Sequence, residues 1–496
     1  MAKITVQALM EESGVAFGTS GARGEVTAMT DRVCYGYTSG FLSYLAELGE
    51  FAEGGRVALA GDLRPSTPRI LAACARAIRD SGGVPVFCGY VPTPALALFA
   101  FAQEIPSLMV TGSHIPADRN GIKFYRPAGE VLKEDEAGMA RQMVDLRADK
   151  FTSQGDLALT EPLPPVTDVE DAYVARYVAH FGAGALAGHR IGVYQHSAVG
   201  RDILARIVRE LGAEVELLGR SDVFIPVDTE AIRPEDIALA MSWAADGRFD
   251  AIISTDGDSD RPLIADETGK WLRGDVLGIL CAARIGATSV VTPVSSNSAL
   301  ERTGWFALCR RTRIGSPYVI AAMTEELATG SARVCGYEAN GGFLLASNIP
   351  GAGAIETTAL PTRDAVLPIL SVLTAAAKSV AAQLAALPQS FTFSDRIAPF
   401  ARAATDHLLG MLLDGDAAAR LALQTQLFGG FAGAAVSLDL TDGVRATFES
   451  GAVIHLRPSG NAPELRCYTE ADSEAAAKAI NREALAAVKA LLKQEA

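Results

Sequence analysis

The chain has 496 residues, of which 49% are hydrophobic and 21% charged, and its formal net charge at pH 7 is −14. The length predicts three or four domains, and the composition is typical of a globular protein. The acidic balance argues against a nucleic-acid-binding protein, because contact with a phosphate backbone needs a basic surface, but it is compatible with small anionic substrates.

The seven cysteines lie far apart and form no Cys-x-x-Cys pair. Their spacing predicts reduced thiols rather than a disulfide framework or a zinc site. The N-terminus lacks the apolar core of a signal peptide, and the apolar runs are too short to cross a bilayer. We therefore expect a cytoplasmic protein without a membrane partner.

The first motif along the chain is Phe17–Gly24, which holds three glycines in seven residues. So many glycines disfavour a helix and suit a loop whose backbone approaches a ligand. Arg23 within it offers a guanidinium to an anion. A flexible turn is the alternative interpretation.

A repeated pattern follows, in which an apolar strand leads through a short loop into a helix, a glycine and a second strand. This order is typical of a βαβ unit, so it predicts three related α/β domains with mixed, mostly parallel sheets, although chance repetition is the alternative. The strand, helix and strand are expected at Arg56–Ala60, Pro68–Asp80 and Val84–Cys88, then at His189–Tyr194, Arg201–Leu211 and Glu214–Leu218, then at Ala287–Thr292, Ala299–Ala307 and Cys309–Ile314.

Each copy is followed by another short strand that ends in a loop rich in polar side chains. Since parallel sheets bind ligands at the carboxyl ends of their strands, we expect these loops to line one cleft. The strands and loops are Ser107–Val110 with Thr111–Tyr125, Phe249–Ser254 with Thr255–Arg261, and Ala332–Cys335 with Gly336–Gly342.

The last part of the chain lacks the repeat. An alanine-rich stretch, Leu367–Leu387, reads as helical, and Pro388 marks a boundary before a smaller α+β domain that ends in a helix. The predicted domains are 1–160, 161–266, 267–387 and 388–496.

In the loop after Val110, Ser113 offers a hydroxyl, His114 a neighbouring proton acceptor and Lys123 a cation. A serine beside a histidine at the end of a buried strand is a candidate nucleophile. A polar surface turn is the alternative for an isolated pair of this kind.

Asp256, Asp258 and Asp260 alternate along the second loop, so their oxygens can converge on one hard cation. Ligation by oxygen alone selects Mg²⁺ or Ca²⁺, and we favour Mg²⁺ because phosphate oxygens can complete its shell. An EF-hand calcium loop requires glycine at the position of Arg261 and flanking helices, whereas strands are expected here. A solvated acidic turn is the other alternative.

Near the C-terminus, guanidinium, hydroxyl, amide and glycine backbone groups gather within ten residues. This composition is typical of a phosphate-binding loop, and a charged surface hairpin is the alternative. The residues are Arg457, Ser459, Gly460, Asn461 and Arg466.

Together, four motifs in this order resemble the α-D-phosphohexomutase family, which contains phosphomannomutases and phosphoglucomutases. The resemblance covers essentially the whole chain and implies four domains around a central cleft, the first three alike. The motifs are Thr111–Pro116, Thr255–Arg261, Gly336–Asn340 and Arg457–Asn461.

The resemblance also implies residue roles. Ser113 would be the phosphorylated serine, which holds Mg²⁺ together with Asp256, Asp258 and Asp260. Glu338 and Asn340 would contact sugar hydroxyls, and the fourth-domain loop would bind phosphate. The polar groups around the reacting phosphoryl group would be Arg23, His114, Lys123 and Arg261.

The expected activity is the interconversion of hexose 6-phosphate and hexose 1-phosphate through a hexose 1,6-bisphosphate, which also serves as activator. The sugar loop is most similar to that of bacterial phosphomannomutases. However, several relatives have serine at the position of Asn340 and some have histidine at that of Gly342, so glucose preference stays open. A bisphosphate synthase and a non-catalytic metal- and sugar-phosphate-binding protein are further alternatives, and we expect a monomer or homodimer.

Overall fold

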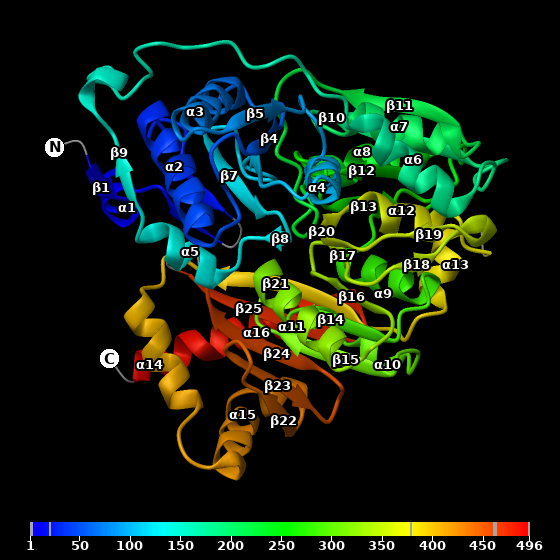
Figure 1. Cartoon of the computed structure of the whole chain (residues 1–496). Coiled ribbons are helices and arrows are strands. Elements are labelled where there is room, and N and C mark those ends of the chain that lie inside the picture. The colour runs from blue at the N-terminus through cyan, green and yellow to red at the C-terminus, as the bar shows by residue number, and fades with distance from the viewer. Residues whose placement is uncertain (1–2, 19–20, 377–378, 460–463, 495–496) are drawn as a thin grey trace.

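The computed structural model describes residues 3–18, 21–376, 379–459 and 464–494, which form four successive units (Figure 1). The first unit contains a sheet with the strand order β2-β3-β7-β6-β4-β5, and β8 pairs with β7. Its strands are β2 (Ala16–Phe17), β3 (Ala22–Glu25), β4 (Arg56–Gly61), β5 (Val84–Phe87), β6 (Ser107–Val110), β7 (Arg119–Arg126) and β8 (Gly129–Glu130). Its helices are α1 (Val6–Ser13), α2 (Asp31–Glu47), α3 (Thr67–Asp80), α4 (Thr93–Ala102) and α5 (Lys133–Ala140), and β1 (Lys3–Thr5) pairs with β9 (Met143–Asp145).

The second unit has a sheet with the order β11-β10-β12-β13. Helix α7 is amphipathic, since Ile203, Leu204, Ile207 and Val208 are buried at helical spacing. The strands are β10 (Arg190–His196), β11 (Glu214–Arg220), β12 (Ala251–Thr255) and β13 (Pro262–Ala265), and the helices are α6 (Glu170–Phe181), α7 (Arg201–Glu210) and α8 (Pro234–Ala244).

The third unit has a sheet with the order β15-β14-β16-β17-β20 and a separate hairpin of β18 (Ile349–Pro350) and β19 (Glu356–Thr357). Its other strands are β14 (Ser289–Pro293), β15 (Leu308–Thr312), β16 (Val334–Tyr337), β17 (Phe343–Leu345) and β20 (Leu360–Asp364). Its helices are α9 (Gly274–Arg284), α10 (Ala299–Arg302), α11 (Ser316–Ala328), α12 (Val366–Leu373) and α13 (Val380–Ala385).

The three sheets repeat one arrangement. The first strand (β4, β10 or β14) lies between two parallel neighbours, and the third strand then pairs with an antiparallel fourth. This confirms the internal repeat and the mixed sheets. The repeat matters for function because it brings the loops after β6, β12 and β16 to the carboxyl ends of parallel strands.

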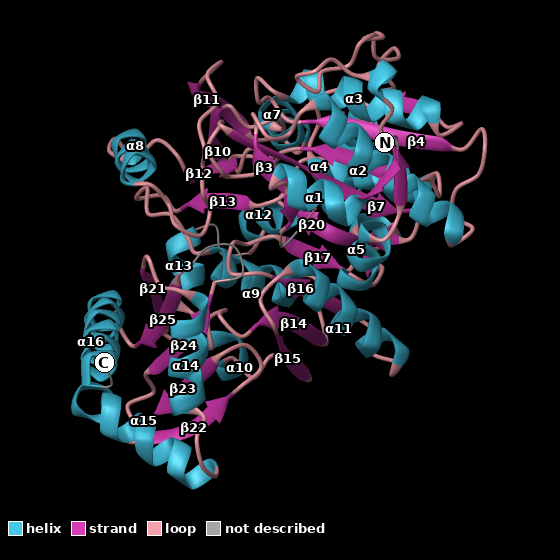
Figure 2. Cartoon of the chain, turned by 90° about the vertical axis from the view of Figure 1, so that its left-hand side faces the viewer, coloured by secondary structure: helices cyan, strands magenta, loops and turns pink. Residues whose placement is uncertain are grey.

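The fourth unit is an antiparallel sheet of order β21-β25-β24-β23-β22 with its own hydrophobic core. Both views place it at the opposite end of the molecule from α3 (Figures 1 and 2). Its strands are β21 (Phe391–Ile397), β22 (Ala435–Asp439), β23 (Val444–Phe448), β24 (Val453–Pro458) and β25 (Leu465–Ala471), and its helices are α14 (Arg402–Leu412), α15 (Ala417–Ala432) and α16 (Glu474–Gln494). The smaller α+β domain is confirmed.

Two expected helices differ in length. Helix α10 ends at Arg302 rather than Ala307, because Gly304 adopts a φ of 64° and turns the chain. The alanine-rich stretch Leu367–Leu387 forms two helices, α12 and α13, instead of one. The second starts where Ser379 accepts a hydrogen bond from the N–H of Ala382, which is the preferred role of serine at a helix N-terminus. In the described part of the chain, no helix is both long and apolar enough to span a membrane.

Candidate active site

Ser113 lies in the loop that follows β6, at the carboxyl end of a fully buried strand. Its φ of 54° falls in the left-handed region that residues other than glycine rarely adopt, and its N–H donates to Thr111 Oγ1 at 2.8 Å. The buried hydroxyl donates to Asp256 Oδ2 at 2.6 Å. A strained turn that directs one hydroxyl at a carboxylate is consistent with a positioned nucleophile.

Arg64, which the sequence analysis missed, holds this loop in place. Its Nε donates to Asp62 Oδ2 at 3.0 Å, and Phe224 from the second unit stacks 4.0 Å from the guanidinium. The remaining N–H groups donate, at 2.6 to 3.0 Å, to the carbonyls of Ser113, Ile115, Pro116 and Arg119. A guanidinium has five N–H donors, so every one is used. Arg64 lies in the loop after β4, at the carboxyl end of another parallel strand, and this position is the sequence signal that could have identified it.

We expect Arg64→Met to loosen the Ser113 loop. The substitution leaves the buried Asp62 carboxylate without its cationic partner, a change that costs about 3–5 kcal/mol. Amide exchange in peptides covering residues 111–121, followed by mass spectrometry, is expected to accelerate at least about a hundredfold. Arg206→Met removes an arginine whose side chain is 43% exposed and is the matched control. Equal exchange in this loop for the two variants would contradict the role given to Arg64.

Asp256, Asp258 and Asp260 lie on the tight loop between β12 and β13, and all three are buried. One carboxylate oxygen from each lies within 4.8 Å of the others. Burial and the two neighbouring carboxylates raise the pKa of Asp256 well above its usual range. The repeated β-strand arrangement thus brings the acidic loop and the Ser113 loop of two different units together.

Lys123 of β7 contributes the positive charge that lies nearest to the three aspartates. Its Nζ donates to Asp258 Oδ2 at 2.6 Å and also to Asp260 Oδ2. Burial alone would raise the pKa of Asp258, but the Lys123 ammonium outweighs it and lowers that pKa. Arg363 of β20, a second residue missed by the sequence analysis, donates through Nε to Asp260 Oδ2 at 3.1 Å.

The three aspartates fit a hard divalent cation. Their donors are all oxygens, which Mg²⁺ and Ca²⁺ prefer. Two buried oxygens, Asp258 Oδ1 and Asp260 Oδ1, have no hydrogen-bond partner among the described residues. Since buried polar atoms are normally paired, these oxygens are available as ligands.

His114 and Arg261 lie beside Ser113. Arg261 Nη1 donates to His114 Nδ1 at 2.7 Å, and that nitrogen is 3.5 Å from Ser113 Oγ. Burial and the positive charge of Arg261 lower the pKa of His114 to about 3, so the imidazole is neutral at pH 7. Its other nitrogen, Nε2, is 3.9 Å from Asp228 Oδ2, a carboxylate that the sequence analysis did not select.

Arg23 lies on β3, the neighbour of β7 in the first sheet. Burial and the adjacent Arg261 lower the pKa of Arg23 to about 10, so it keeps its charge at pH 7. The Nε atoms of Arg23 and Arg261 are buried and have no hydrogen-bond partner among the described residues. Two guanidinium groups with available donors can bind a phosphoryl group at Ser113.

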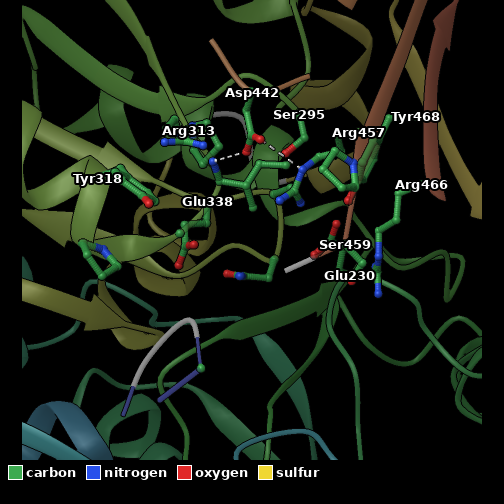
Figure 3. A pocket seen from close by; sticks show the side chains of 18 of the residues that line it. Glu230, Ser295, Arg313, Tyr318, Glu338, Asp442, Arg457, Ser459, Arg466 and Tyr468 are labelled. Atoms are coloured by element: carbon green, nitrogen blue, oxygen red, sulfur yellow. Dashed lines mark hydrogen bonds and ion pairs between the residues drawn. The ribbon is translucent and has the colours of Figure 1, made fainter. Parts of the chain in front are cut away.

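A cavity of about 460 Å³ opens beside the cluster of Ser113, His114 and Arg261, and Figure 3 shows side chains that line this cavity. All four units contribute to its lining, and His114 connects it to Ser113. Of the sequence-predicted residues, the structure places His114, Glu338, Asn340, Arg457, Ser459 and Arg466 around the cavity. Gly460 and Asn461 lie outside the described residues.

The sugar-loop residues are held by contacts from other elements. Glu338 Oε2 accepts from Arg363 Nη1 at 3.0 Å, so Arg363 connects it to the acidic loop. The side chain of Asn340 accepts from the N–H of Gly342 at 2.9 Å, and its carbonyl accepts from Thr229 Oγ1 at 2.7 Å. The loop therefore presents Glu338 to the cavity from a fixed position.

Several cavity residues were missed by the sequence analysis because they belong to no recognised motif. They include Glu230, a half-buried acidic side chain whose pKa is raised by desolvation. The others with charged or aromatic side chains are Lys133, Arg313, Tyr318, Asp442 and Tyr468.

Comparison with known proteins identifies the family. Four models described as phosphoglucomutase/phosphomannomutase match in order: alpha/beta/alpha domains I, II and III over residues 14–147, 171–269 and 273–391, and the C-terminal domain over residues 415–487. The chain belongs to the phosphoglucomutase/phosphomannomutase family. Our predicted domain boundaries stay predictions, because a match marks similarity and not the end of a domain.

Two relatives with curated names indicate the class of enzyme to which the chain belongs. A protein of Sinorhizobium fredii named phosphomannomutase is 45% identical over 95% of this chain and 98% of its own length. One of Salmonella muenchen with the same name is 44% identical over 94% of both chains. The chain is therefore an enzyme of the phosphohexomutase class, an intramolecular phosphotransferase.

Solved structures agree on the fold. A phosphoglucomutase/phosphomannomutase family protein from Burkholderia thailandensis matches with a TM-score of 0.74 at 20% identity, covering 98% of both chains. A putative phosphomannomutase from Thermus thermophilus matches with a TM-score of 0.71 at 22% identity, covering 96% of this chain and 99% of its own. The four-domain architecture expected from the motifs is confirmed.

Proposed function

We propose that the chain interconverts hexose 6-phosphates and hexose 1-phosphates and prefers mannose phosphates, which is phosphomannomutase activity. The observation that carries this proposal is the buried Ser113 hydroxyl, 2.6 Å from Asp256 within the acidic cluster and next to a cavity lined by cations. The preference for mannose is supported by relatives at 45% and 44% identity that are named phosphomannomutase.

In the proposed reaction, Ser113 carries a phosphoryl group. A hydroxyl of the bound hexose monophosphate attacks phosphorus, and the new P–O bond forms as the bond to Ser113 Oγ breaks. The product is a hexose 1,6-bisphosphate, which turns over in the cavity. Ser113 Oγ then attacks the other phosphoryl group of the bisphosphate and takes it. The isomeric hexose monophosphate leaves the site, and Ser113 is phosphorylated again.

The chain's own residues neutralise charge and move the proton. Arg23 and Arg261 donate to the phosphoryl oxygens. The proton of the attacking hydroxyl passes to the neutral imidazole of His114 and returns in the second transfer. Lys123 can take this part only by giving one of its own protons to Asp258 or Asp260 as it accepts the new one. Asp256, Asp258 and Asp260 would hold Mg²⁺ together with phosphorylated Ser113, and this ion supplies positive charge to the phosphoryl group when bound.

We expect Glu338→Gln to lower kcat/KM for hexose 1-phosphates by about 10- to 100-fold, because a hydrogen bond to a charged group contributes about 1.5–3 kcal/mol. The proposed sugar hydroxyl loses a carboxylate acceptor that Arg363 holds in place. Glu325→Gln is the control, since Glu325 lies in the same unit with a side chain that is 63% exposed. If both variants lose the same activity, Glu338 does not contact the sugar.

The proposed activity is tested by initial rates. Purified protein with Mg²⁺ and a trace of hexose 1,6-bisphosphate is given mannose 1-phosphate and glucose 1-phosphate in parallel. Faster conversion of mannose 1-phosphate supports the proposal, whereas faster conversion of glucose 1-phosphate makes the enzyme a phosphoglucomutase. Bisphosphate that accumulates without monophosphate product indicates a synthase. Absence of turnover with either sugar overturns the proposal.

A further inference from the structure

The cations around the cavity differ in how they are paired. Lys133 Nζ is 2.8 Å from Glu136 Oε2, Arg466 Nη2 is 3.2 Å from Glu464 Oε2, and Arg457 Nε is 3.4 Å from Asp442 Oδ1. Arg313 is exposed to the cavity and stacks 5.5 Å from the ring of Tyr318. Among the described residues, no carboxylate lies within ion-pair distance of Arg313. Its charge is therefore available to an anion in the cavity.

Asp442 connects the loop of Arg313 to Arg457. Its Oδ2 accepts from the backbone N–H of Ile314, the residue next to Arg313, at 3.0 Å. Its Oδ1 faces Arg457, so one carboxylate joins the third unit to the phosphate-binding strand of the fourth. In Figure 3 the Asp442 carboxylate lies between the Arg313 loop and the Arg457 side chain.

The turn that carries Asp442 is fixed on β24. His455 Nε2 lies 2.5 Å from the Asp442 carbonyl. Gly443 has a φ of 86°, and a Cβ there would lie 2.3 Å from the carbonyl oxygen of Leu456, so no other residue fits this approach. The turn that carries Asp442 is therefore fixed to β24, the strand that contains Arg457.

We propose that Arg313 is a phosphate-binding residue supplied by the third unit, and that Asp442 positions it opposite Arg457 when the fourth unit docks. This inference rests on the proposed function and assigns a contact to the phosphate that is not being transferred. A guanidinium binds phosphate through parallel hydrogen bonds. Because the two arginines come from different units, phosphate binding favours the docked arrangement of the units.

The test measures binding without turnover. In the Ser113→Ala background, calorimetry gives Kd for mannose 1-phosphate and for inorganic phosphate. We expect Arg313→Met to raise both Kd values by about 10- to 100-fold, which is the effect of losing hydrogen bonds to a charged group. The Kd values of Arg313→Lys are expected to lie between those of the parent and those of Arg313→Met. Arg333→Met, which removes another exposed arginine of the third unit away from this cavity, is expected to leave both unchanged.

Asp442 is tested as a positioning residue. Asp442→Ala is expected to raise Kd, as Arg313→Met does. Asp442→Asn is expected to keep most of the affinity, because its amide oxygen still accepts from the N–H of Ile314. In the double variant, the effects of Asp442→Ala and Arg313→Met are expected to be less than additive. Circular dichroism of each variant verifies folding. Unchanged Kd for phosphate in Arg313→Met, or full additivity with Asp442→Ala, overturns the inference. Because phosphate binding is measured without catalysis, this result is separate from a failure of the proposed mutase activity.

Discussion

Ser113→Ala is expected to lower kcat by about 10⁴-fold or more, the range found when an enzyme loses its nucleophile. The proposed transfer passes both phosphoryl groups through Ser113 Oγ, so the alanine variant has no group that can accept or donate them. The structure gives this hydroxyl its place through the left-handed turn and the contact with Asp256. Initial rates with mannose 1-phosphate and mass spectrometry of the Ser113 peptide provide the two measurements.

Ser107→Ala is a matched control for this prediction. Ser107 starts the same strand, is fully buried, and its hydroxyl has no hydrogen-bond partner among the described residues. Its loss is therefore expected to leave both kcat and phosphate incorporation unchanged. If Ser113→Ala retains full activity in a preparation free of host mutase, another residue carries the phosphoryl group and the proposed mechanism fails.

The parts of the site that the sequence predicted share a local signal. Ser113 and the aspartates from Asp256 to Asp260 directly follow short apolar strands, and the repeated βαβ order indicates that those strands end at the same edge of their sheets. Glu338 follows β16 in the same way. Such residues can be found because strand, loop and chemistry are consecutive in the chain.

The parts that were missed depend on contacts between distant segments. Arg363 lies on β20, and its partner Asp260 precedes it by 103 positions. Asp442 lies in a turn of the fourth unit and accepts from Ile314 in the third. In neither case does the neighbouring sequence mark the side chain, because its function comes from how two units pack. The alanine-rich stretch was misread for a different reason, because Ser379 begins α13 through a local hydrogen bond that the sequence itself could have indicated.

Removal of divalent cations is expected to have the second largest effect. With EDTA we expect the rate to fall by at least about 10³-fold, because charge stabilisation at a transferring phosphoryl group contributes several kcal/mol. Added Mg²⁺ is expected to restore activity. The rate of Asp258→Asn is expected to be lower by a similar factor. Added Mg²⁺ is not expected to restore it, because the variant has one charged ligand fewer.

A readout independent of turnover decides whether these aspartates bind the ion. A ligand that binds only the folded state raises the unfolding temperature, so Mg²⁺ is expected to raise the Tm of the parent protein but not that of Asp258→Asn. Asp246→Asn makes the same charge change at a side chain that is 56% exposed in the same unit, and is expected to keep the Mg²⁺-dependent rise. A rise of equal size in Asp258→Asn would place the ion elsewhere, whereas a larger rise with Ca²⁺ than with Mg²⁺ would favour a calcium site on the same oxygens.

Because Lys123 already contacts Asp258 and Asp260, the lysine must share these carboxylates with the ion. Lys123→Met is therefore expected to strengthen the Mg²⁺-dependent rise in Tm even as it removes a group proposed to move the proton.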